Sequence, residues 1–356
     1  MTEVLIVGAS FAGLAAAREL KGRDVLIVDR SPIGAHQTSA CALPLRLVQW
    51  LGAEESVLYA ESRMRVEIGD AQWNVRLPEE FAVIDYKACC LAIARQTDAR
   101  FEQIRVVGRD GAFALGSAGE RLEADWLIDA SGWRRVLDPD GPTRGSQPSL
   151  VIGTEDHVPT AAAPHADGFA FYLEKQLLKS GYGWSFPAGD HVRAGVGSFI
   201  KEPLQPPMER LRRRDTLGPG REHHGGAIAC NPRDPVAGGV LFIGDAAGQA
   251  LPVTLEGIRP AVYFGAGAGR LVMHALADEL TPAQAQDRYA ALHQQHLSGY
   301  ARLNRIQRWY RWLPEFALKR LATKALGRPH ADGREIGFRS TRYLDVLRAE
   351  QLPALP

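Results

Sequence analysis

The first thirty residues contain the pattern that most constrains the fold of this chain. Residues 4–7 are a short apolar run, typical of a strand buried on both faces, and the sequence GASFAG follows directly at residues 8–13. A helix is expected from about residue 12 to residue 20, and residues 25–28 form a second apolar run. This order of strand, glycine-containing turn, helix and strand predicts a parallel sheet with the turn at its carboxyl edge.

This turn indicates a site for the ADP half of a dinucleotide. Gly8 permits a tight turn, the small Ser10 lets the backbone approach a pyrophosphate, and Gly13 lets helix and strand pack closely. The amino end of the helix then faces the phosphates. Asp29 lies 21 residues after Gly8, where a carboxylate can accept hydrogen bonds from ribose hydroxyls. The alternative is a turn of this shape without a ligand.

A second motif lies far along the chain. Residues 240–243 form a third apolar run, which ends at Gly244 and Asp245 before a helical stretch from about residue 257 to residue 276. A carboxylate at the end of a buried strand can hold a ribityl hydroxyl of a flavin. The alternative is an ordinary aspartate at a helix amino end.

Together with the sequence DWLIDASG at residues 125–132, the two motifs resemble the flavoprotein family typified by p-hydroxybenzoate hydroxylase, over residues 1 to about 275. The resemblance implies FAD, with its adenine end at the first motif and its ribityl end at Asp245. It also implies that backbone N–H groups near Gly257 face the flavin, where a helix amino end would stabilise the reduced anion; Glu256 has the alternative role of capping that helix. The expected cofactor contacts are Gly8, Ser10, Phe11, Ala12, Gly13, Asp29, Arg30, Val107, Ser131, Gly132, Gly244, Asp245, Glu256, Gly257 and Ile258.

The expected fold class is α/β: a three-layer Rossmann-like FAD-binding domain with a parallel sheet and a β-meander, an inserted antiparallel-sheet substrate domain, and C-terminal helices. Residues 101–130 alternate as a meander, and residues 63–77 read as a hairpin. Residues 150–200 contain four further strand-like runs. The expected boundaries are 1–62, 79–147 and 228–295 for the FAD-binding domain, 63–78 and 148–227 for the substrate domain, and 296–356 for the C-terminal helical region.

The sequence YGWSFP at residues 182–187, with glycines at 195 and 197, resembles the signature of geranylgeranyl reductases, which saturate isoprenoid double bonds. Flavin halogenases carry W-x-W-x-I-P at this place. Alternate residues of a strand point the same way, so Tyr182, Trp184 and Phe186 are expected to form one aromatic wall beside an apolar substrate, and the first two are candidate catalytic residues. The alternative is that the three rings fill the core.

Cys41 favours the same branch, because geranylgeranyl reductases tend to carry a cysteine in the loop after the second strand. The family usually has glycine directly after this cysteine, where this chain has Ala42, and glycine before the Glu-Gly-Ile triplet, where it has Leu255. Cys41 is a candidate proton donor, and the alternative is a small side chain that fills an apolar gap. A leucine at position 255 would narrow the pocket near the flavin.

Composition and charge limit the partners. A net charge of +1 gives no general attraction to nucleic acid, and none is expected. The four cysteines lack C-x-x-C spacing, so a reducing cytoplasm is expected, and His223 with His224 lacks a spaced third ligand, so no metal site is expected. No run of about 18 apolar residues predicts a transmembrane helix. The basic, aromatic segment 300–328 predicts either peripheral contact with anionic lipid or helices that cover the flavin domain.

The expected activity is FAD-dependent reduction of a carbon–carbon double bond in an isoprenoid or another apolar substrate. One alternative is an FAD-dependent monooxygenase that uses dioxygen to hydroxylate or epoxidise a small apolar or aromatic substrate. Another is a flavoprotein that transfers electrons at a lipid surface. No second G-x-G-x-x-G builds a nicotinamide domain, so the expected donor is transiently docked NADPH or NADH, or an electron-donor protein.

Overall fold

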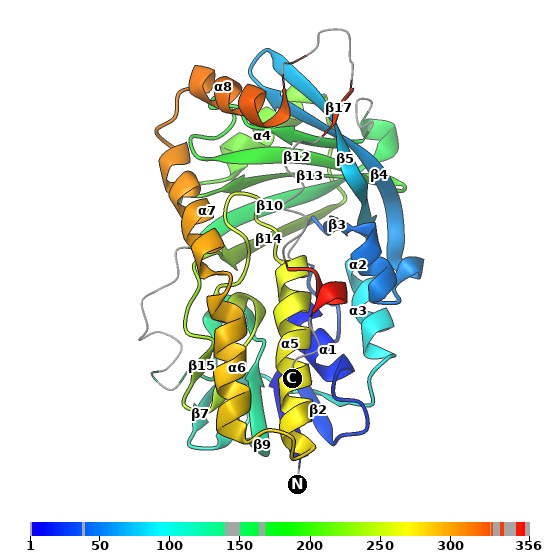
Figure 1. The fold of residues 1–356 in the computed structure, drawn as a ribbon. Coiled ribbons are helices and arrows are strands. Elements are labelled where there is room, and N and C mark those ends of the chain that lie inside the picture. The colour runs from blue at the N-terminus through cyan, green and yellow to red at the C-terminus, as the bar shows by residue number, and fades with distance from the viewer. Residues whose placement is uncertain are drawn as a thin grey trace.

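Two β-sheets organise the chain, one in the lower half and one in the upper half of the view in Figure 1. The computed structural model describes residues 2–37, 40–138, 140, 150–163, 168–327, 329, 335–337 and 347–352. The lower sheet carries the dinucleotide motif. The upper sheet carries the aromatic strand.

The lower sheet has the strand order β15-β16-β9-β1-β2-β6, with a meander attached to β9. Strand β1 pairs in parallel with β2 and with β9, and all three are rich in buried aliphatic residues, because helices cover a parallel sheet on its faces. The strands are β1 (Thr2–Val7), β2 (Val25–Asp29), β6 (Arg100–Gln103), β7 (Val106–Asp110), β8 (Phe113–Gly116), β9 (Arg121–Asp129), β15 (Val236–Ala237) and β16 (Val240–Phe242).

Two helices cross the lower sheet side by side, α1 (Phe11–Arg18) and α5 (Ile258–Leu276). They approach closely because α5 carries glycines at the contact. A Cβ atom on Gly265 would lie 2.3 Å from the carbonyl oxygen of Ala12, and one on Gly269 would lie 2.4 Å from that of Ala16. This packing brings the amino ends of both helices to the same side of the sheet. Three further helices complete this half: α2 (Leu45–Trp50), α3 (Tyr86–Ala94) and α6 (Pro282–Gln294).

The upper sheet has the order β14-β10-β13-β12-β11-β4-β5-β17, and β3 also pairs with β5. Its pairs are antiparallel except β11 with β4 and β17 with β5, which are parallel. The strands are β3 (Ala42–Pro44), β4 (Val57–Ile68), β5 (Ala71–Ile84), β10 (Leu150–Pro159), β11 (Phe169–Tyr172), β12 (Gly181–Ala188), β13 (His191–Ser198), β14 (Glu222–Ala229) and β17 (Glu335–Gly337).

Strands β4 and β5 are longer than the hairpin predicted at residues 63–77, and they reach from the upper sheet to the lower half of the molecule. The expected domain boundaries at 62/63 and 78/79 therefore fall inside continuous strands, and the boundary at 147/148 lies outside the described residues. A β-bulge near Glu61 and Arg63 in β4 bends this ribbon, which lets one hairpin serve both halves.

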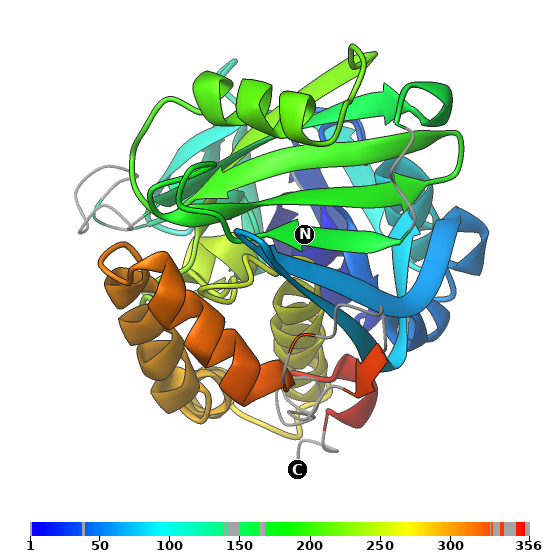
Figure 2. The same ribbon diagram turned by 90° about the horizontal axis from the view of Figure 1, so that it is seen from above.

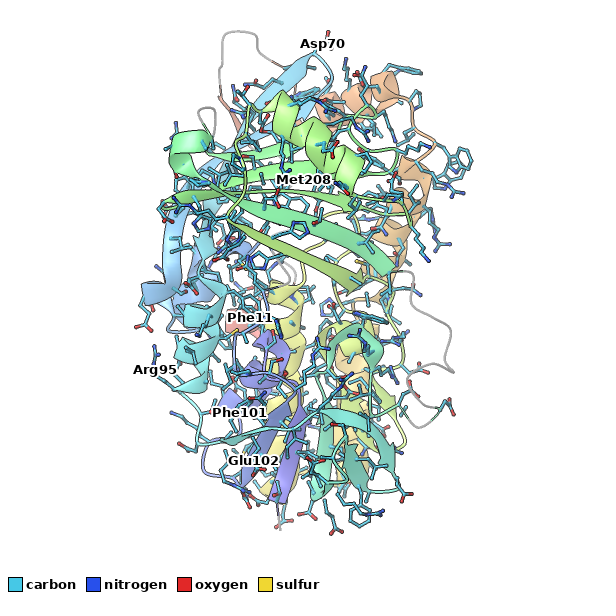
Figure 3. All side chains as sticks on the ribbon, turned by 180° about the vertical axis from the view of Figure 1, so that it is seen from behind. Phe11, Asp70, Arg95, Phe101, Glu102 and Met208 are labelled. Atoms are coloured by element: carbon cyan, nitrogen blue, oxygen red, sulfur yellow. The ribbon has the colours of Figure 1, made fainter. Side chains whose placement is uncertain are left out.

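Three helices cover the upper sheet: α4 (Gln205–Arg214), α7 (Leu297–Tyr310) and α8 (Glu315–Leu326). Figure 2 shows α4 on one face of the sheet and α8 on the other. Met208 of α4, labelled in Figure 3, belongs to a buried cluster with residues of β11 and β13, whereas Leu318 of α8 packs with residues of β4 and β5. Pro314 directly precedes α8. Among the described residues, no helix has both the length and the apolar character needed to cross a membrane.

Candidate functional site

A cavity of about 450 Å³ opens at the carboxyl edge of the lower sheet, beside the turn after β1. Thirteen of the fifteen predicted cofactor contacts line it, although they come from six separate parts of the chain. They are Gly8, Ser10, Phe11, Ala12, Asp29, Arg30, Val107, Ser131, Gly132, Gly244, Asp245, Gly257 and Ile258. We call this space the cofactor cavity.

The glycines of the first turn are fixed by close backbone approach. Gly8 has a φ of +116°, and a Cβ atom there would lie 2.2 Å from the carbonyl oxygen of Ala130. A Cβ atom on Gly13 would lie 2.0 Å from the carbonyl oxygen of Gly8. Gly13 therefore lets the helix pack closely against the turn, as expected. It does not line the cavity.

Asp29 at the end of β2 braces the turn after β1. Its Oδ2 accepts a hydrogen bond from the Ala9 N–H at 2.9 Å, and its Oδ1 accepts one from the Ser31 N–H at 3.0 Å. The side chain is nevertheless part of the cavity wall. Asp29 therefore shapes the turn and also lies where a carboxylate that binds ribose hydroxyls is expected.

Asp129, within the DWLIDASG motif, is a fully buried carboxylate for which the sequence predicted no role. It accepts hydrogen bonds from the Ser131 N–H at 2.9 Å, the Ser131 hydroxyl at 2.6 Å and the Leu137 N–H at 2.7 Å. Burial raises its pKa, and these hydrogen bonds oppose that rise. Asp129 thus holds the loop that places Ser131 and Gly132 in the cavity wall, and an aspartate two residues before serine is the signal of such a turn.

Asp245 also lines the cofactor cavity, in a short helical turn at Gly244–Ala247 that follows β16. Removal of its carboxylate from water raises its pKa to about 6, against the opposing effects of a backbone hydrogen bond from Ala229 and the charge of Arg233. A hydroxyl donated by a ligand would stabilise the ionised form. The desolvated carboxylate therefore suits the predicted contact with a polyhydroxylated chain.

The amino ends of α1 and α5 both border the cofactor cavity, through Phe11 and Ile258. Neither helix has an acidic residue in its first turn. The Ser10 side chain does not cap α1, and Gly257, which precedes α5, has no side chain that could cap it. The partial positive charges of both amino ends are thus available to an anionic ligand. A cavity bordered by these two helix ends and by Asp245 fits the phosphates and the flavin of FAD.

A second cavity, of about 430 Å³, lies between the upper sheet and the turn before α5. It shares Ile228, Leu255, Gly257 and Ile258 with the cofactor cavity, so the two spaces meet there. Its wall is mostly apolar and contains the aromatic residues Phe81, Phe169, Phe171, Tyr182, Trp184, Phe186, Phe199 and Tyr310. We call it the apolar cavity.

Tyr182, Trp184 and Phe186 of β12 all line the apolar cavity, as strand alternation predicts. The ring centroids of Tyr182 and Trp184 lie 6.1 Å apart, and their planes meet at 61°. The glycine pair that follows on β13 makes room for the indole, because a Cβ atom on Gly195 would lie 2.3 Å from Trp184 Cζ2. The tyrosine hydroxyl donates a hydrogen bond of 2.5 Å to the carbonyl oxygen of Thr254, which ties the wall to the turn at the cofactor cavity.

Cys41 is fully buried and lines the apolar cavity. Its backbone is left-handed, with a φ of +58°. Burial raises the pKa of its thiol to about 12, and the buried guanidinium of Arg193 opposes the rise. The thiol is therefore protonated at neutral pH, which suits a proton donor and excludes a standing thiolate nucleophile.

Leu255 stands at the junction of the two cavities with a φ of +57°. This conformation favours glycine and costs other residues roughly 1–2 kcal/mol. The side chain extends toward the upper sheet, since a Cβ atom on Gly197 would lie 2.9 Å from Leu255 Cδ1. Leu255 therefore narrows the connection between the cavities.

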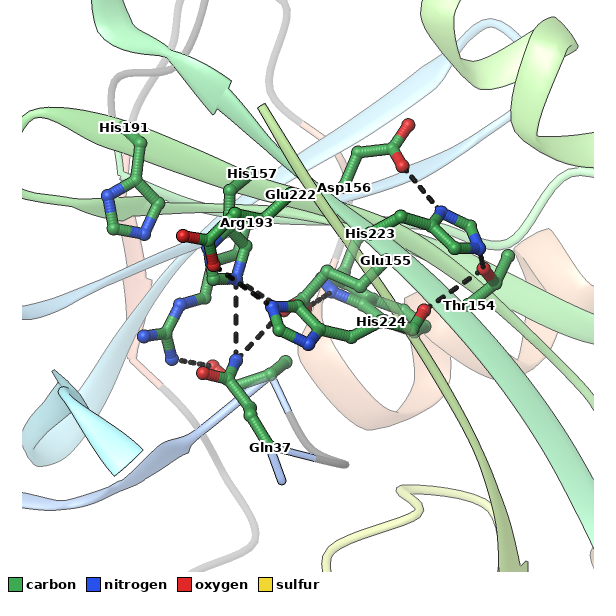
Figure 4. A network of polar contacts seen from close by, with 12 residues as sticks. Gln37, Thr154, Glu155, Asp156, His157, His191, Arg193, Glu222, His223 and His224 are labelled. Carbon is green, nitrogen blue, oxygen red and sulfur yellow. Dashed lines mark hydrogen bonds and ion pairs between the residues drawn. The ribbon is translucent and has the colours of Figure 1, made fainter. Parts of the chain in front are cut away.

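Behind the aromatic wall lies a polar network that the sequence did not reveal (Figure 4). Glu155 of β10 accepts a hydrogen bond of 2.8 Å from Trp184 Nε1, and its other oxygen lies 3.3 Å from the Gln37 side-chain amide. Arg193 donates a hydrogen bond of 3.1 Å to the carbonyl oxygen of Ala40. These contacts fix both the indole and the loop that carries Cys41. They depend on strand register, so linear spacing gives no signal for them.

Comparison with known proteins gives relatives over most of the chain. Digeranylgeranylglycerophospholipid reductase 1 of Methanopyrus kandleri is 28% identical over 325 residues, which cover 81% of this chain and 84% of that protein. The chloroplastic geranylgeranyl diphosphate reductase of Oryza sativa is 38% identical over 170 residues, 45% of this chain and 35% of that protein. No protein-family model matches the chain.

Solved structures share the fold. A geranylgeranyl bacteriochlorophyll reductase-like protein of Thermoplasma acidophilum superimposes with a TM-score of 0.77 at 18% identity, over 93% of this chain and 94% of that one. The flavin-dependent brominase Bmp2 gives a TM-score of 0.64 at 16% identity, over 91% and 90%. The motifs, the fold and the sequence relatives agree: the chain is an FAD-dependent oxidoreductase, and it is similar to geranylgeranyl reductases over most of its length.

Proposed function

We propose that this enzyme binds FAD in the cofactor cavity and reduces a carbon–carbon double bond of an isoprenoid lipid held in the apolar cavity. The observation that carries the proposal is the meeting of the two cavities at Leu255, Gly257 and Ile258. The adenine end would lie at Gly8 and Asp29, the ribityl chain at Asp245, and the reactive ring at the junction. The names of the sequence relatives supply the substrate class, an unsaturated isoprenoid.

The proposal assigns roles to three residues of the apolar cavity. Reduced FAD would supply a hydride to one carbon of the double bond. Tyr182 and Trp184 would hold the chain flat against the junction, because their rings form one face of the cavity. Cys41 would give its proton to the adjacent carbon, and Arg193 would stabilise the thiolate left behind until solvent returns a proton.

An exposed face on α7, α8 and the segment between them supports a lipid substrate. Trp309, Trp312 and Phe316 are 63%, 67% and 74% exposed, which is unusual for large apolar side chains. Arg305, Arg308 and Arg311 are exposed on the same stretch. Tyr310, between them in sequence, lines the apolar cavity. We propose that this aromatic-basic face rests on an anionic membrane and that the lipid chain enters beside Tyr310.

The electron donor is proposed to be NADPH or NADH that docks transiently, with an electron-donor protein as the alternative. The cofactor cavity is proposed to hold one dinucleotide, FAD, so a nicotinamide must approach from outside that cavity. Stopped-flow reduction of the bound flavin by each nicotinamide, followed by its visible absorbance, distinguishes the two sources: no reduction by either nicotinamide favours a protein donor.

The decisive assay is anaerobic reduction of a panel of polyprenyl lipids by the FAD-loaded enzyme, with product mass as the readout. A gain of two hydrogens per double bond in the absence of dioxygen supports the proposal. Turnover that requires dioxygen and adds oxygen to the product identifies a monooxygenase instead. The apolar cavity argues against electron transfer without a substrate, since such a protein needs no apolar space beside the flavin.

The role of Cys41 has its own test. Cys41→Ser keeps the size of the side chain but replaces a thiol with a much weaker acid, so the single-turnover rate of product formation should fall while FAD binding stays unchanged. Equal single-turnover rates in the variant and the wild type would remove Cys41 from the proposed mechanism.

A further inference from the structure

Two paired strands bring histidines and a glutamate together at one end of the upper sheet. In the antiparallel register of β10 with β14, His157 faces Glu222 and Glu155 faces His224. Residues directly opposite share one face of a sheet, and residues two apart on a strand do too. These four side chains therefore lie on one face, and Figure 4 shows the rings of His157 and His224 turned toward each other.

The ligand atoms have the spacing of a tetrahedral metal centre. Glu222 Oε2 lies 3.4 Å from His157 Nδ1 and 3.5 Å from His224 Nε2, and one ligand atom from each of the three residues lies within 4.8 Å of the others. A tetrahedron with metal–ligand bonds of about 2.0–2.1 Å has edges of about 3.4 Å. Two of the three edges already have that length.

His157 is also oriented as metal-bound histidines are. Its second ring nitrogen, Nε2, lies 3.4 Å from Glu155 Oε1. A carboxylate behind a histidine fixes the tautomer that leaves the other nitrogen free to bind a metal. Because the other oxygen of Glu155 holds Trp184, a cation at this place would be connected to the aromatic wall.

His224 offers a ring nitrogen to the same space. Its Nε2 is buried and makes no well-formed hydrogen bond among the described residues. The ring of His191 stacks on His157 at 4.6 Å and encloses the cluster from the β13 side.

We propose that His157, Glu222 and His224 form a binding site for a divalent transition-metal ion of the zinc class, with one coordination position open to water. Two imidazoles and one carboxylate are a ligand set that Zn²⁺ takes with an open fourth position. The cation would clamp the edge strand β14 to β10 and steady Glu155 and Trp184. The linear sequence hid the site, because His157 lies 65 residues before Glu222.

The test is metal binding to the FAD-loaded, chelator-treated full chain. Titration with Zn²⁺ by calorimetry and with Co²⁺ by visible absorbance should show one site, and a tetrahedral Co²⁺ spectrum. Glu222→Gln and His224→Ala should each weaken Zn²⁺ binding by at least about 10–100-fold, because loss of a residue that only supports a metal ligand already costs that much. Glu222 is 65% exposed at its side chain, so Glu222→Gln is expected to leave the fold intact.

His223→Ala is the matched control. This histidine is adjacent in sequence but faces the other side of the sheet, where its Nδ1 lies 2.8 Å from Asp156 Oδ1 and its Nε2 lies 3.1 Å from Thr154 Oγ1. It should bind Zn²⁺ like the wild type. The proposal is overturned if the wild type binds neither ion, if Glu222→Gln and His224→Ala bind as the wild type does, or if His223→Ala loses binding equally. None of these outcomes depends on the reductase activity.

Discussion

The left-handed backbone at Leu255 predicts a measurable difference in folding stability between two variants of this residue. Leu255→Gly and Leu255→Ala both remove the half-buried isobutyl group, so that loss largely cancels between them. They differ in that alanine keeps a Cβ atom at a φ of +57°, which costs roughly 1–2 kcal/mol. Glycine avoids this cost but gives the unfolded chain more freedom, worth about 0.4–1 kcal/mol. The glycine variant should be more stable by about 1 kcal/mol.

Urea denaturation at one fixed, saturating FAD concentration, followed by far-UV circular dichroism, measures this difference. With m values of about 1–3 kcal/mol/M, the midpoint of Leu255→Gly should exceed that of Leu255→Ala by about 0.3–1 M. Equal midpoints, or a higher midpoint for the alanine variant, would refute the argument that position 255 favours glycine. The comparison needs no substrate, so it stands apart from the proposed reaction.

Three further predictions concern other parts of the site. A raised carboxyl pKa, about 6 at Asp245, means that the folded apoprotein binds the proton more tightly than the unfolded chain, so this group lowers stability as pH rises from about 4 to about 6. Asp245→Asn should therefore make the urea midpoint of the apoprotein fall less steeply with rising pH, and it should weaken FAD binding in fluorescence titrations. A steeper decline, or tighter FAD binding, would contradict this. Gly195→Ala should cost about 1–3 kcal/mol of stability, because its Cβ would overlap Trp184, whereas Gly225→Ala, whose nearest atom is 3.4 Å away, should be near neutral in the same denaturation assay. The double variant Trp309→Ser with Trp312→Ser should sediment less with anionic vesicles than the wild type does, and unchanged sedimentation would remove this face from the proposed membrane contact.

Much of the lower half of the molecule was predictable because its signals are local. The helix expected at residues 12–20 is Phe11–Arg18, and the one expected at residues 257–276 is Ile258–Leu276. A buried parallel strand, a glycine turn and a helix amino end are each encoded within a few neighbouring residues. Alternation along one strand likewise sufficed to place Tyr182 and Trp184 on the wall of one cavity.

The sequence alone is enough to predict the dinucleotide turn at Gly8, the parallel strands around it and the aromatic strand at Tyr182, because each depends on short-range periodicity and on the conformational freedom of glycine. The folded chain is needed to see that the two cavities meet at Leu255, that Glu155 holds the indole of Trp184, and that His157 lies beside His224. These contacts depend on strand register and on the packing of one sheet against another. Glu155 and Trp184 are 29 positions apart in the chain and His157 and His224 are 67 apart, and nothing in their local sequence encodes these contacts.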